Sequence, residues 1–131
     1  MTWLFAARAR GVDFSELATL GRQGFFPDRR SLQWAFDRHA PGLDATQFLR
    51  ESNGYAERFF ELLGTKHLTS FDRSEYEGAS TLHDLNTAIP PALENRFSAV
   101  LDAGTIEHVF NAPQAAKRSD VQYYAGVSIF F

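Results

Sequence analysis

Three aspartates in the second half of the chain each close a short, largely apolar run. They are Asp72 after residues 67–71, Asp84 after residues 80–83, and Asp102 after residues 97–101. Runs of this length, rich in aromatic and β-branched residues, predict strands. In an open α/β sheet the carboxyl ends of the strands form the edge at which ligands bind. The spacing therefore predicts a cluster of carboxylates at one ligand-binding edge.

Carboxylates in this position suit a nucleoside. Asp72 could accept both hydroxyls of a ribose, and Asp84, followed by Leu85, could accept the exocyclic amine of adenine while Leu85 flanks the ring. A second interpretation is purely structural, because Asp is common where a strand enters a loop and caps the turn there. Both interpretations stay open from the residues alone.

A metal site is the other chemistry to weigh. His83, Asp84, Asp102, Glu107 and His108 are suitable ligand types. However, Glu107 and His108 are adjacent, and neighbours on a helix do not face each other. We therefore predict no metal site. The chain has no Cys, which excludes disulfides, thiolate metal sites and cysteine catalysis.

Composition narrows the class of protein. The 131 residues fit one domain, and 13 of them are Phe. The net charge is −3 and the basic residues are scattered, so we expect no nucleic-acid partner. No run of 18 apolar residues occurs and the first residues do not resemble a secretory signal, so we expect no membrane partner and a cytoplasmic location.

The elements that must position the aspartates follow from periodicity and caps. Helices are predicted over 2–10, 28–39, from the N-cap Asp44 with Gln47 in the capping-box position, and through the stripe Tyr55, Phe59, Leu62 and Leu63, closed by Gly64. Strands are predicted at 17–20, before Gly21-Arg-Gln-Gly24, and at 127–131, and a helical stretch at 106–110. The fold class is α/β, a Rossmann-like, parallel-type sheet flanked by helices. Only residues 72–80 separate the first two aspartate-ended strands, fewer than a parallel crossover usually needs.

These segments together resemble class I S-adenosylmethionine-dependent methyltransferases. The resemblance is carried by Tyr76-Glu-Gly-Ala79, by residues 82–86, and above all by Asp102-Ala-Gly-Thr-Ile-Glu-His108. It covers residues 17–118. It divides a single domain, 1–131, into an N-terminal helix (1–16), a cofactor-binding part (17–118) and an atypical tail (119–131).

The resemblance implies a role for each matched residue. Gly21 and Gly24 would lie near the methionine end of S-adenosylmethionine, where a missing Cβ lets the backbone approach. Asp72 would bind the ribose, and Asp84 with Leu85 the adenine. Asp102 would lie on the substrate side of the cofactor site. Glu107 or His108 would remove a proton from a small-molecule acceptor that the sequence does not identify.

The chain departs from that family at two places. The first loop is usually Gly-x-Gly-x-Gly, and the shorter loop 21–24 predicts weak cofactor binding. The family's sheet has seven strands. The residues after Arg118 are predicted to supply at most one strand, so the sheet is predicted to be incomplete. The alternative function is therefore a truncated, non-catalytic remnant or interaction module. An uncovered sheet edge of that kind could support self-association.

Overall fold

A computed structural model describes residues 1–76, 78–104, 121–124 and 127–130. Its helices are α1 (Thr2–Ala9), α2 (Arg29–His39), α3 (Ala45–Ser52) and α4 (Glu57–Leu62), with a short 3-10 turn, η1 (Pro91–Leu93). Its strands are β1 (Glu16–Leu20), β2 (His67–Asp72), β3 (Thr81–Leu82), β4 (Ala99–Asp102), β5 (Val121–Tyr124) and β6 (Val127–Phe130). The predicted helix at 106–110 lies outside the described residues.

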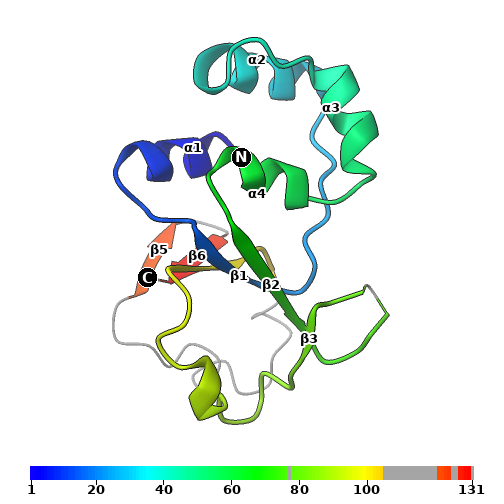
Figure 1. Cartoon of the computed structure of the whole chain (residues 1–131). Coiled ribbons are helices and arrows are strands. Elements are labelled where there is room, and N and C mark those ends of the chain that lie inside the picture. The colour runs from blue at the N-terminus through cyan, green and yellow to red at the C-terminus, as the bar shows by residue number, and fades with distance from the viewer. Residues whose placement is uncertain (77, 105–120, 125–126, 131) are drawn as a thin grey trace.

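Within the described residues, six strands form one sheet in the order β3-β2-β1-β4-β6-β5 (Figure 1). The pairs β3–β2, β2–β1 and β1–β4 are parallel, and helices flank this part of the sheet, so the predicted α/β Rossmann-like class is confirmed. The remaining two pairs, β4–β6 and β6–β5, are antiparallel. The tail therefore supplies two strands, and the expectation of at most one was wrong.

The central strand β1 is buried on both of its faces. Leu17 packs with the helices, while Ala18 and Leu20, which point to the other face, are also buried. A parallel strand covered on both sides reads as a continuous apolar run, which explains why residues 17–20 show no polar alternation.

The hydrophobic core lies between the sheet and the helices. Phe5 of α1 and Phe25 both contact Phe59 of α4, and Phe36 of α2 contacts Phe48 of α3 edge to face. Many of the 13 phenylalanines therefore pack in the hydrophobic core. In Figure 1, α1 and α4 lie next to the sheet, and α2 and α3 lie beyond them.

Local signals place the helix ends close to where the sequence predicts them. The Asp28 and Asp44 side chains accept hydrogen bonds from the backbone N–H groups of Ser31 and Gln47, at 2.9 and 2.8 Å. The second half of the predicted capping box is wrong, because the Gln47 side chain donates to Glu51. Gly64 has φ +93° and directly follows the C-cap of α4, as predicted for a C′ glycine.

The apolar stripe of α4 is rotated from the predicted one. Phe59 and Leu63 are buried as expected, but Ala56 and Phe60 complete the buried face, and Tyr55 and Leu62 are only partly buried. The helix begins at Glu57, after Tyr55, so Tyr55 is not held to the helical period.

The short link between β2 and β3 is compatible with parallel pairing because β3 has only two residues. Thr81 and Leu82 pair with Phe71 and Asp72, the last residues of β2. β3 therefore starts level with the end of β2, and the chain does not have to cross the full length of a strand, which removes the need for a dozen-residue crossover.

A buried phenylalanine and an exposed one together provide a matched test of the core. Phe36 is fully buried, whereas Phe26 is 85% exposed. We expect Phe36→Ala to lower the free energy of unfolding by about 3–5 kcal/mol, and Phe26→Ala to change it by less than about 0.5 kcal/mol. Urea unfolding followed by circular dichroism measures both. Equal losses in the two variants would contradict this packing.

Candidate functional site

The parallel strands bring the predicted site residues to one edge of the sheet. Leu20, the last residue of β1, pairs with Phe71 of β2 and with Asp102 of β4, and Asp72 pairs with Leu82 of β3. Gly21 therefore lies at the same edge as Asp72 and Asp102, and Asp84 follows two residues after β3. The prediction that the three carboxylates gather at one edge of the sheet is confirmed, whereas ligand binding at this edge stays a prediction. We call it the carboxyl edge.

The strand order reverses within this edge. From β1 the chain passes outward to β2 and β3, then returns to place β4 on the other side of β1. In open α/β sheets such a reversal marks the crevice in which ligands bind. Gly21 and Asp102 are the residues that border the reversal, since Leu20 and Asp102 are paired.

Each of the three aspartates also caps its own turn. The Oδ1 atoms of Asp72, Asp84 and Asp102 accept hydrogen bonds from the backbone N–H two residues later, at 3.0, 2.9 and 3.2 Å. The structural interpretation of these acids is therefore confirmed for all three. It fixes the orientation of each carboxylate relative to its strand.

The acids differ in exposure. Asp72 and Asp84 are partly exposed, whereas only 6% of Asp102 is accessible. The pKa of Asp84 is lowered, first by the hydrogen bond from the Asn86 backbone N–H and next by the bond from the Asn86 side chain. Leu85 lies between Asp84 and Asn86 and is partly exposed. The turn that contains it is closed by a hydrogen bond of 2.9 Å from the Thr87 N–H to the Asp84 carbonyl.

The loop after β1 is held by the protein's own contacts. Gly21 has φ +75°, a left-handed conformation that favours glycine, and its N–H donates to the Phe71 carbonyl at 2.7 Å. The Gln23 side-chain amide donates to the carbonyls of Leu20 and Gly21 at 2.7 and 3.1 Å.

A neighbouring aromatic ring explains why residue 24 is a glycine. A Cβ at this position would lie 2.7 Å from Cε2 of Phe26, and Gly24 forms an isolated antiparallel bridge with Tyr55. A cofactor approaching that side of Gly24 would have to displace the Phe26 ring.

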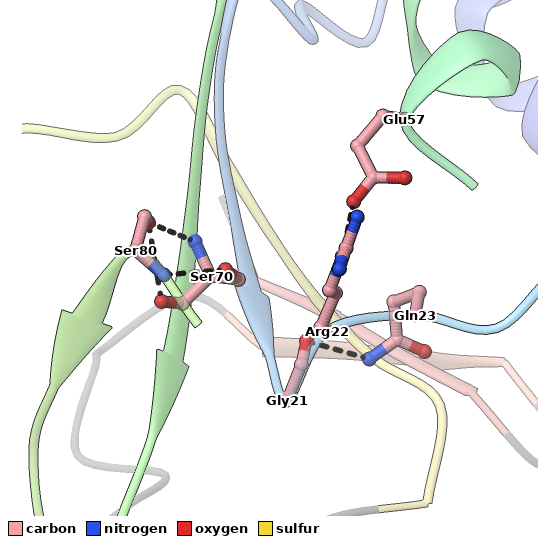
Figure 2. A network of polar contacts seen from close by, with 6 residues as sticks. All are labelled: Gly21, Arg22, Gln23, Glu57, Ser70 and Ser80. Atoms are coloured by element: carbon pink, nitrogen blue, oxygen red, sulfur yellow. Dashed lines mark hydrogen bonds and ion pairs between the residues drawn. The ribbon is translucent and has the colours of Figure 1, made fainter. Parts of the chain in front are cut away.

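Arg22 joins this loop to α4 (Figure 2). Its Nε lies 2.6 Å from Oε1 of Glu57, and its guanidinium carbon lies 3.5 Å from the centre of the Tyr55 ring. Sequence reasoning missed this contact, because Arg22 and Glu57 are 35 residues apart. The signal that the sequence offered was a cationic residue, Arg22, between the loop glycines Gly21 and Gly24.

A pair of serines fixes β3 beside β2 (Figure 2). The Ser70 N–H donates to Oγ of Ser80 at 2.9 Å, and the Ser80 N–H donates to Oγ of Ser70 at 3.0 Å. Sequence reasoning missed this serine clamp as well. It sets where β3 starts, and through that the position of Asp84 relative to Asp72.

Glu107 and His108, the predicted proton acceptors, lie outside the described residues. Among the residues that the structure describes, no three His, Asp or Glu side chains group in a way that could hold a metal ion. In the same part of the chain, no helix is long and apolar enough to cross a membrane.

Comparison with known proteins gives no assignment. No protein-family model, no curated protein and no solved structure matches the chain.

The serine clamp predicts the cost of removing one hydroxyl. Ser80→Ala leaves the Ser70 N–H without its acceptor, and we expect a loss of about 1–3 kcal/mol in unfolding free energy. Amide hydrogen exchange at Ser70 should become faster. Ser74→Ala is the matched control, since Ser74 contributes its backbone N–H to Asp72. Slow exchange at Ser70 in the Ser80→Ala variant would contradict the clamp.

The lowered pKa of Asp84 predicts a pH dependence. Because the folded-state pKa lies below the unfolded value of about 3.9, the ionised carboxylate stabilises the fold above that pH, and the contribution is lost as the pH falls through the folded-state pKa. We expect the difference in Tm between wild type and Asp84→Asn to shrink between about pH 6 and pH 3. Thermal unfolding across this range measures it, and a constant difference would contradict the assignment.

Proposed function

We propose that the chain is a methyltransferase-like protein that binds S-adenosylmethionine at the carboxyl edge. One observation carries the proposal: the parallel order β3-β2-β1-β4 gathers Gly21, Asp72, Asp84 and Asp102 at an edge where the strand order reverses. Dinucleotide-binding α/β sheets use the same order of their first four strands and bind ligands at this reversal.

The residues at the edge fit the nucleoside part of the cofactor. Asp72 is partly exposed, and its Oδ1 is oriented by Ser74, so the carboxylate is positioned for a ribose diol. Asp84 and Leu85 are partly exposed on the neighbouring turn and would take the adenine. Asp102 is buried where the strand order reverses. A buried carboxylate in this position would hold the neighbouring residues of the edge in place.

The methionine part fits less well. Gly21 has the backbone conformation that a close approach needs, whereas the side of Gly24 is covered by Phe26. This arrangement supports the expectation of weak binding.

The chemistry that such a cofactor supplies is an electrophilic methyl group on a sulfonium. The work left to the chain is orientation, because in-line transfer depends mainly on holding the acceptor and donor in line. For a hydroxyl or amine acceptor, Glu107 or His108 would accept the proton that the acceptor loses.

A binding module without turnover is the second candidate, and the placement of β6 favours it. Beside β4, where a doubly wound sheet continues with a parallel strand, this chain has the antiparallel strand β6. The loop that a fifth parallel strand would contribute to the carboxyl edge is therefore replaced by the β5–β6 hairpin. The outer strands β3 and β5 are the sheet edges at which a second copy could pair.

The cofactor proposal predicts the effect of Asp72→Ala. A carboxylate bound to a ribose makes charge-assisted hydrogen bonds worth about 1.5–3 kcal/mol each, so we expect affinity for S-adenosylhomocysteine to fall at least about tenfold. Isothermal titration of monodisperse protein measures it.

Asp13→Ala is the matched control. Its carboxylate caps the same kind of turn, with the Ser15 N–H at 2.8 Å, but it precedes β1 and lies away from the carboxyl edge. Equal affinity in wild type and Asp72→Ala would remove Asp72 from the ribose site. Absence of binding by wild type would favour the module without turnover.

A further inference from the structure

The outer face of α2 carries a stripe of basic and aromatic side chains. Leu32, Ala35 and Phe36 form the buried face of this helix. Arg30, Trp34 and Arg38 follow one another at intervals of four residues, a spacing that puts them on one exposed face. We call these three residues the α2 stripe.

The stripe has internal order. The guanidinium carbon of Arg38 lies 3.9 Å from the centre of the Trp34 ring, and half of the Trp34 surface is exposed. Stacking on an indole restrains a guanidinium while leaving its in-plane N–H groups directed outward, the arrangement that recognises carboxylates in a bidentate manner.

The charge of α2 is opposite to that of the whole chain. The helix contains three arginines and one aspartate, a net charge of +2, in a chain of net charge −3. That aspartate, Asp37, accepts a hydrogen bond from Gln33, and Asp28 is used to cap the helix. The helix is therefore a local basic region on an acidic protein.

We propose that the α2 stripe binds an acidic segment of a partner protein. Tryptophan and arginine are among the residues enriched in binding hot spots, and here they are in contact and exposed. The complementary partner carries carboxylates at a spacing that matches Arg30 and Arg38, which eight residues of helix separate by about 12 Å.

A protein segment fits better than a nucleic acid. Two guanidinium groups neutralise few phosphates, and phosphate neutralisation supplies most of the affinity of a protein for a nucleic acid. The stripe is also remote from the proposed cofactor site, since α1 and α4 lie between α2 and the sheet (Figure 1). Binding here is therefore independent of the function proposed for the carboxyl edge.

Fluorescence anisotropy with a labelled octaglutamate peptide at low salt tests the proposal on the full chain. We expect saturable binding by wild type, at least tenfold weaker binding by Arg30→Gln/Arg38→Gln, and weaker binding by Trp34→Ala than by Trp34→Phe. The matched control, Arg10→Gln/Arg96→Gln, removes the same charge from exposed arginines elsewhere and should bind like wild type. Circular dichroism establishes that each variant is folded.

Three outcomes would overturn the proposal. The first is an equal loss of peptide binding in the stripe and control variants, which would mean that only net charge matters. The second is tighter, stripe-dependent binding of single-stranded oligothymidylate than of octaglutamate. The third is a wild-type dimer in sedimentation that the stripe variant converts to a monomer, which would make a second copy the occupant.

Discussion

The arrangement of the molecule depends on the parallel pairing of β1 with both of its neighbours. All five residues of β1 pair with β2, and four of them pair with β4. Because the strands run in the same direction, their carboxyl ends fall together, and loops that are far apart in sequence become neighbours. Burial of Leu17, Ala18 and Leu20 on the two faces of β1 keeps this strand in the interior of the sheet, between its two parallel neighbours.

The carboxyl edge shows how a structural and a ligand-binding role can share one side chain. Capping a turn occupies one lone pair of a carboxylate oxygen, and an ionised carboxylate has about four acceptor positions. The hydrogen bond from Ser74 therefore orients Asp72 without exhausting its capacity to accept others. On the side of the first loop, the Phe26 ring lies against Gly24 and limits the approach of a ligand to that part of the backbone.

The segment that connects β1 to β2 contains α2, α3 and α4, which differ in their position relative to the sheet. Helices α2 and α3 are inserted before α4, and α4 alone returns the chain to the sheet. The beginning of α4 meets the loop after β1 through the Gly24–Tyr55 bridge and the Arg22–Glu57 ion pair. The inserted helices contribute Phe36 and Phe48 to the core, and their outer surface, which includes the α2 stripe, faces away from it.

Features that depend on nearby residues followed from the sequence alone. The start of a helix at residue 28, the N-cap at Asp44, the C′ glycine at Gly64 and the strands ending at Asp72 and Asp102 follow from local composition, since capping and pleating act within a few residues. Tertiary structure decided the rest: which strands pair and in which direction, that β6 runs antiparallel to β4, that Tyr55 faces Arg22, and that Ser80 clamps Ser70. These contacts join segments whose relative positions are set by burial of the common core, and no short window of sequence contains both partners.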